Sequence, residues 1–191
     1  MRDGTRKKTL ILNGSPRKDG DTAALIRALT KELTGEVFVL DCCGAPIAPC
    51  ADCRRCRKMP GCAIRDGMED LDAVIRTCGN AVIASPVWFS ELTGPLLTVA
   101  SRFQTYYCAR RVRHEETGIQ SKRGGVILTG GGDGDPKKAL STAETLLRMI
   151  SVTRMHPPVM SLATDTLPAA EDPLAAEGVK SLAVFLNGGE G

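Results

Sequence analysis

Short apolar runs rich in β-branched residues alternate with segments of helical period along most of this chain of 191 residues. The first run, TLILNG, is followed by the helical segment TAALIRALTKEL, and the alternation continues to a last helical segment at residues 174–186. Parallel strands need crossover connections, and helices in those connections cover both faces of the sheet. The alternation therefore predicts an α/β fold with a doubly wound, parallel sheet of five strands.

No repeat and no linker divides these elements. We therefore expect one domain over residues 1–191, with a fold of flavodoxin-like type and a cysteine-rich loop at residues 42–66, after the second strand. A composition that is 42% hydrophobic supplies a core of ordinary size. The strands are expected at residues 9–14, 36–41, 80–87, 124–132 and 158–165, and the helices at residues 22–33, 68–78, 93–113, 136–150 and 174–186.

The N-terminal stretch MRDGTRKKTLILNG is charged and then enters an apolar run of strand length. It contains no signal-peptide pattern, and no part of the chain is apolar over a length that would cross a bilayer. We therefore expect a soluble, cytoplasmic protein with no membrane partner. The net charge of +3 is small and the basic residues are dispersed, which gives no reason to expect nucleic-acid binding.

The loop after the first strand, NGSPRKDGDT, is the first candidate site, because ligands of such sheets bind at the carboxyl ends of the strands. It offers the hydroxyls of Ser15 and Thr22, the cationic side chain of Arg17, and the free N–H groups of a helix N-terminus. It has neither the lysine of a P-loop nor the three glycines of a dinucleotide-binding turn. We predict a monophosphate site; the alternative is an ordinary strand-to-helix turn capped by Thr22.

The loops after the third and fourth strands are expected at the same edge. The third strand leads into SPVWFSELTG, which contains the chain's single tryptophan, and the fourth ends in TGGGDGD. Glycines let a backbone approach a planar ring closely, and a flat aromatic ligand would complement the phosphate site. The alternatives are that Trp88 belongs to the core and that the glycines form a tight turn.

Four of the eight cysteines, Cys50, Cys53, Cys56 and Cys62, lie in the stretch CADCRRCRKMPGC. In a reducing compartment such spacing indicates metal ligands more often than disulfides. Three thiolates from a tight loop and a fourth six residues later can hold one [4Fe-4S] cluster; tetrahedral zinc and free or redox-active thiols are the alternatives. The basic residues between the thiols either offset thiolate charge or form a solvated face. No ligand role is predicted for the remaining cysteines, Cys42, Cys43, Cys78 and Cys108.

The motifs LNGSPRKDGDT and SPVWFSELTG and the cysteine stretch resemble those of the iron-sulfur flavoproteins, a branch of the flavodoxin-like NADPH-dependent FMN reductase superfamily. The likeness covers about residues 8–135 and implies FMN and a [4Fe-4S] cluster as cofactors. Asp21 stands where the family often has asparagine, so its alternative role is to cap the helix. The resemblance implies that Ser15, Arg17, Asp21 and Thr22 surround the FMN phosphate, and that Pro86, Val87, Trp88, Phe89 and Ser90 lie along the isoalloxazine ring. Thr129, Gly130 and Gly131, from the glycine-rich loop, complete the predicted cofactor site.

We therefore expect an FMN-dependent redox protein that transfers electrons between a [4Fe-4S] cluster, or a ferredoxin-like donor, and FMN. One alternative is a cluster-free, NAD(P)H-dependent FMN or quinone reductase with a zinc-bound or reduced cysteine loop. A second is a non-catalytic module that binds FMN and a metal. No side chain is predicted to act as a catalytic acid or base. The resemblance implies a homodimer or homotetramer. The expected electron donor is a ferredoxin-like protein, which the basic cysteine loop would attract, or NAD(P)H.

Overall fold

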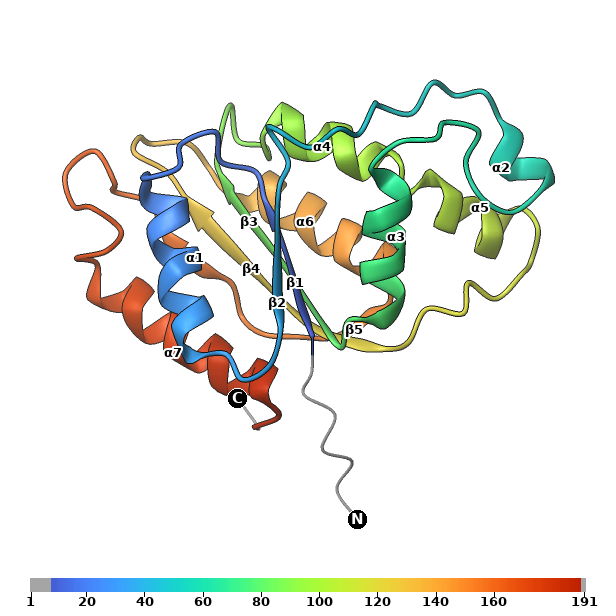
Figure 1. Cartoon of the computed structure of the whole chain (residues 1–191). Helices are drawn as coiled ribbons and strands as arrows, with labels where there is room; N and C mark the ends of the chain where they lie inside the picture. The colour runs from blue at the N-terminus through green and yellow to red at the C-terminus, as the bar shows by residue number, and fades with distance from the viewer. Residues whose placement is uncertain (1–7, 190–191) are drawn as a thin grey trace, which may run out of the picture.

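The computed structural model describes residues 8–189, and its centre is one parallel β-sheet (Figure 1). The strand order is β2-β1-β3-β4-β5, and β6 pairs with the carboxyl-terminal half of β4. This order and the helical crossovers confirm the predicted flavodoxin-like α/β fold. The strands are β1 (Thr9–Asn13), β2 (Val37–Asp41), β3 (Asn80–Pro86), β4 (Lys122–Thr129), β5 (Val152–Met155) and β6 (Val159–Ser161).

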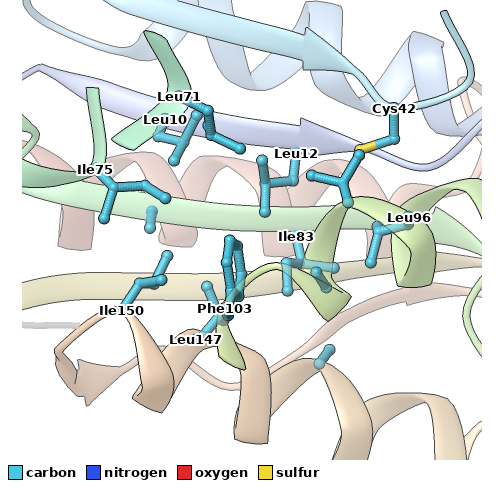
Figure 2. Close-up of a cluster of buried hydrophobic side chains, with 14 of the residues drawn as sticks. Leu10, Leu12, Cys42, Leu71, Ile75, Ile83, Leu96, Phe103, Leu147 and Ile150 are labelled. Carbon is cyan, nitrogen blue, oxygen red and sulfur yellow. The ribbon is translucent and has the colours of Figure 1, made fainter. Parts of the chain in front are cut away.

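Helices cover both faces of the sheet (Figure 1). Successive side chains of a strand point to opposite faces, so Ile11 of β1 packs against α1 and α7 while Leu10 and Leu12 pack against α3, α4 and α6. Figure 2 shows the cluster that contains Leu10 and Leu12, in which Ile75 and Phe103 pack against the strands. The helices are α1 (Asp21–Glu32), α2 (Arg55–Lys58), α3 (Met68–Thr77), α4 (Gly94–Ser101), α5 (Gln104–Arg111), α6 (Lys137–Met149) and α7 (Pro173–Asn187).

The fifth strand position is occupied by two short strands, where the sequence predicted a single strand at residues 158–165. Only β6 falls within that range, and β5 was not predicted. β5 and β6 both pair with β4, and His156, Pro157 and Pro158 separate them. Proline has no N–H to donate to a strand ladder, so two consecutive prolines interrupt the pairing. His156 itself is held by hydrogen-bonding contacts of Nε2 with Ser181 Oγ (2.9 Å) and of Nδ1 with the Pro157 carbonyl (2.7 Å).

The long helix predicted at residues 93–113 is two helices, α4 and α5. The amides of Arg102 and Phe103 donate to carbonyls three residues earlier, which tightens the backbone and ends α4. A further short helix, α2, lies within the cysteine-rich loop, where only a loop was predicted. In Figure 1 this loop extends beyond the sheet and brings α2 beside α5, and the two helices are in contact.

Within residues 8–189, every helix is either too short or too polar to cross a bilayer. The expectation of one domain over residues 1–191 stays a prediction.

Candidate functional site

The loop between β1 and α1 runs along the carboxyl edge of the sheet, as the sequence predicted. Its backbone is fixed locally, because Asn13 Oδ1 accepts the N–H of Ser15 (3.0 Å) and Ser15 Oγ accepts the N–H of Arg17 (3.2 Å). Gly14 is required here: a Cβ at this position would lie 2.8 Å from Thr93 Oγ1 and 2.9 Å from Leu96. Ser15 is buried and the Arg17 side chain is exposed, so the loop presents a fixed hydroxyl beside a free cation.

A cavity of about 180 Å³ opens beside this loop, at the carboxyl ends of β1, β3 and β4. Every residue of the predicted cofactor site lines it except Phe89 and Ser90. Thr22, at the start of α1, and Thr129, at the end of β4, are both buried and line the cavity. Their Oγ1 atoms are hydrogen-bonded to each other at 2.7 Å. The structure therefore brings together three separate predicted segments around one space.

Asp21 does not cap α1, since it is the first residue of the helix and the N-cap position is held by Gly20. Its Oδ1 instead accepts the N–H of Ala169 at 2.9 Å and so holds the segment that leads into α7. The alternative role proposed for Asp21 is thus wrong, and its carboxylate is occupied by a contact within the chain.

Phe89 and Ser90 form the tip of a tight turn and do not line the cavity. The backbones of Trp88 and Glu91 exchange two hydrogen bonds of 2.9 Å, and φ is +53° at Phe89 and +61° at Ser90. Positive φ at both central residues is typical of a two-residue hairpin turn, but costs about 1–2 kcal/mol for each non-glycine residue. This turn leaves Phe89 99% exposed and Trp88 45% exposed.

Thr164 and Asp165, which follow β6, also line the cavity, and sequence reasoning missed them. The Thr164 N–H donates to the Gly130 carbonyl (3.0 Å). A Cβ on Gly131 would lie 2.1 Å from a carboxylate oxygen of Asp165, so only glycine fits between them. The signal was available, because the carboxyl end of the fifth strand position meets the same sheet edge.

A second cavity, of about 210 Å³, lies under the cysteine-rich loop. All four predicted ligands, Cys50, Cys53, Cys56 and Cys62, line it. A fifth thiol, that of Cys108 on α5, lines it as well. The structure thus gathers the predicted thiols around one space and adds a cysteine for which no ligand role was predicted.

The buried side chain of Arg102 forms hydrogen bonds with residues at both ends of the cysteine-rich loop. Its side chain is 1% exposed, and Nη1 donates to the Ala48 carbonyl (2.8 Å) and to Asp66 Oδ2 (2.7 Å). Nη2 donates to the Ile64 carbonyl at 3.1 Å. Burial acts to raise the pKa of Asp66, but hydrogen bonds from Arg102 and from the amides of Ala48 and Met68 outweigh it and hold the pKa below its ordinary value.

Two further contacts attach the loop to the helices beneath it. Ser101 Oγ, at the end of α4, accepts the N–H of Cys50 at 2.9 Å. Arg113, just after α5, donates to the carbonyl of Cys56. The loop is therefore fixed by protein contacts at its two ends and at two of its thiol-bearing residues.

The sulfurs of Cys56 and Cys108 are 3.5 Å apart, with Cys56 as the donor. Burial, and then the neighbouring Cys108 thiol, raise the pKa of Cys56 to about 11. Sequence spacing could not indicate Cys108, because it lies on a different helix, far along the chain from the clustered cysteines.

The donor set fits a thiophilic metal group. Thiolates are the ligands that iron-sulfur clusters and zinc prefer. Among residues 8–189, however, no three histidine, cysteine or acidic side chains converge closely enough to hold a single metal ion.

The strand order and the cavity at the carboxyl ends of the strands define an α/β protein of the flavodoxin-like class. The chain belongs to the NADPH-dependent FMN reductase family, whose model matches residues 7–166. An iron-sulfur flavoprotein of Archaeoglobus fulgidus is 27% identical over 144 residues, which are 74% of this chain and 62% of the relative. An iron-sulfur flavoprotein of Methanocaldococcus jannaschii is 22% identical over 126 residues, 64% of this chain and 62% of the relative. These relatives confirm the predicted family, although the chain spans only 62% of the length of each.

Solved structures show the same fold. An NAD(P)H:quinone oxidoreductase from Methanothermobacter marburgensis superposes with a TM-score of 0.71 at 13% identity, over 94% of this chain and 96% of that one. An azoreductase from Bacillus anthracis superposes with a TM-score of 0.62 at 15% identity, over 95% of this chain and 99% of that one. At these identities the likeness concerns the fold alone.

Proposed function

We propose that this chain is an FMN-dependent oxidoreductase in which electrons pass between a [4Fe-4S] cluster at Cys50, Cys53, Cys56 and Cys62 and FMN in the cavity at the sheet edge. Bound FMN exchanges one or two electrons and a cluster exchanges one, so the pair can join a one-electron partner to two-electron chemistry. NAD(P)H or a ferredoxin-like protein is the proposed donor.

The residues around the sheet-edge cavity suit the two ends of FMN. The phosphate would lie against Ser15, Arg17 and the first turn of α1, where free N–H groups favour an anion. The ring would lie between Trp88 and the backbone of Gly130 and Gly131, which carry no side chain to obstruct it.

Helix α4 supplies the observation that carries the proposal, because it touches both sites. Thr93, at its N-cap, donates from Oγ1 to the Gly14 carbonyl of the phosphate loop (2.7 Å). Ser101, its last residue, holds the amide of Cys50. The eight residues of α4 span about 12 Å, so one short, rigid element sets the separation of the two loops.

The test is the composition and visible spectrum of protein purified without oxygen. The proposal predicts about one FMN per chain, with iron and sulfide in equal amounts near four of each, and a broad absorption beside the flavin bands that bleaches with dithionite. Protein that contains flavin but never iron and sulfide, even after reconstitution, would remove the cluster from the proposal.

A cluster-free NAD(P)H-dependent quinone reductase is the second candidate. The fold it shares with the quinone oxidoreductase of Methanothermobacter marburgensis favours it, as does the lack of three converging metal-ligand side chains within residues 8–189. Flavin that is reduced by NAD(P)H and reoxidised by quinones, in protein with no iron, is the result that selects it.

A further inference from the structure

Cys56 and Cys108 are a contacting pair of thiols from two different elements. Cys56 lies on α2, within the cysteine-rich loop, and Cys108 lies on α5. Their sulfurs are 3.5 Å apart, which is van der Waals contact. The cavity they share is lined by five thiols, one more than a cluster with four cysteine ligands uses.

The geometry allows the pair to bond. A disulfide needs a sulfur–sulfur distance of about 2.05 Å, so the thiols must approach by about 1.5 Å. No residue of α2 is buried, so even with the Arg113 hydrogen bond to the Cys56 carbonyl this short helix can shift by that amount more easily than α5, whose Cys108 is 1% exposed.

We propose that Cys56 and Cys108 form a redox-active dithiol, and that oxidation by hydrogen peroxide closes it to a disulfide that withdraws Cys56 from the metal-binding set. The disulfide rests on the contact alone. Its effect on metal binding rests on the proposed function, in which Cys56 is a ligand.

The accessibility of the two thiols assigns their order of reaction. Cys56 is half-buried and opens to the cavity, so peroxide reaches it first. Cys56 must first lose its proton, and because its pKa is raised to about 11 only a small fraction is thiolate near neutral pH, so the reaction should quicken as pH rises. That thiolate attacks one peroxide oxygen, the O–O bond breaks, and the hydroxide released is protonated to water, which leaves a sulfenic acid on Cys56. The Cys108 thiolate then attacks the Cys56 sulfur, the S–O bond breaks, and a second water leaves. The two thiols lose two electrons and two protons in total, and one peroxide is reduced to two waters.

Gln104 supports the role of Cys108 as the resolving thiol. Its Nε2 lies 3.9 Å from Cys108 Sγ, one turn earlier on α5, and donates to it. This donor and the packing around α5 hold the sulfur in place while α2 moves. After closure three thiols remain around the cavity, which cannot complete a four-cysteine site.

The test uses the full chain, reduced and freed of metal, with hydrogen peroxide as the oxidant. Peptide mapping should show a Cys56–Cys108 cross-link, and free-thiol titration should fall by two per chain. Cys108→Ala, a change that suits a buried helix position, should yield no cross-link and leave the Cys56 sulfenic acid unresolved and trappable. Cys43→Ser, which removes an exposed thiol outside the cavity, should behave as wild type.

Metal binding is then measured separately, by reconstitution with iron and sulfide. The oxidised wild type should incorporate several-fold less cluster than the reduced wild type and regain it with dithiothreitol. A cross-link from Cys56 to another cysteine, or none at all, would overturn the dithiol. A Cys56–Cys108 cross-link with unchanged cluster incorporation would overturn the effect on metal binding. Failure of the reduced wild type to incorporate any cluster, with the cross-link present, would instead reject the proposed function and leave the dithiol standing.

Discussion

Thr93 and Ser101 stand at opposite ends of α4, and each fixes the backbone of a different site. Thr93 is fully buried and donates to the Gly14 carbonyl (2.7 Å), whereas Ser101 accepts the amide of Cys50 (2.9 Å). Each contact removes a backbone group from competition with solvent. The phosphate loop and the cysteine-rich loop are therefore positioned by one helix, through two independent side chains.

Removing either hydroxyl should affect one site and spare the other. Ser101→Ala should weaken metal retention in the cysteine-rich loop by about 1 kcal/mol, because the Cys50 amide loses its acceptor. Thr93→Val should weaken FMN binding by a similar amount, since the Gly14 carbonyl loses its donor. FMN fluorescence titration and chelator competition measure the two effects. Equal loss of both ligands in either variant would contradict the separate roles.

The phosphate loop should discriminate FMN from riboflavin. Ser15→Ala combined with Arg17→Ala should weaken FMN binding by about 1.5–3 kcal/mol for each charge-assisted hydrogen bond removed. Riboflavin, which lacks the phosphate, should bind wild type and variant equally, and so serves as the matched control. Wild-type protein that binds riboflavin as tightly as FMN would show that this loop holds no phosphate.

The pair Arg102–Asp66 should make the cysteine-rich loop sensitive to acid. The pKa of Asp66 is held below its ordinary value in the folded protein, so its contribution to stability is present above the ordinary carboxyl range and is lost as pH falls. The free energy of unfolding of wild type should therefore fall more steeply below about pH 4 than that of Asp66→Asn. Urea unfolding at a series of pH values measures how the free energy of unfolding changes with pH. Equal slopes for wild type and Asp66→Asn would show that this pair does not contribute to the acid sensitivity.

Replacing Arg102, the other member of the pair, should lower the free energy of unfolding at pH 7 more than Asp66→Asn does. Arg102→Met leaves the Asp66 carboxylate largely buried without its cation, which should cost about 3 kcal/mol at pH 7. The double variant Arg102→Met with Asp66→Asn removes the uncompensated charge and should recover part of the loss. A double variant no more stable than Arg102→Met alone would show that the cost arises from lost packing.

Much of the fold and of the sheet-edge site could be predicted from the sequence. Periodicity identified β1 to β4, β6 and the helices α1, α3, α6 and α7, but it missed β5 and α2 and joined α4 to α5. The rule that ligands bind at the carboxyl ends of parallel strands correctly placed three distant loops beside one cavity. Three features could not be found in this way. The helix break lies at Arg102, whose side chain contacts the cysteine-rich loop. The turn at Phe89 adopts a backbone that its residue type disfavours, and Cys108 reaches the thiol cavity only through tertiary packing.

We expect the basic residues of α2 to form a docking surface for an acidic electron donor. Arg55, Arg57 and Lys58 are exposed, whereas Arg54 is paired with Asp52 at 3.5 Å. Reversing Arg55 and Arg57 to glutamate should slow FMN reduction by ferredoxin at low ionic strength and flatten its dependence on salt. Reduction by NADPH is the control and should not change. A rate of reduction by ferredoxin that keeps its salt dependence in the variant would show that these residues form a solvated surface without a docking role.

The central claim, that electrons reach FMN through the cysteine-bound group, is tested most directly by rapid mixing of reduced ferredoxin with wild type and Cys53→Ser under anaerobic conditions. Cys53 is preferred to Cys56 because it lies outside the contact with Cys108 and is exposed. Serine removes the soft sulfur ligand and keeps the size. The account predicts that Cys53→Ser keeps its FMN and a melting temperature within a few degrees of wild type, but loses ferredoxin-driven flavin reduction. Flavin reduction at the wild-type rate in that variant would contradict it.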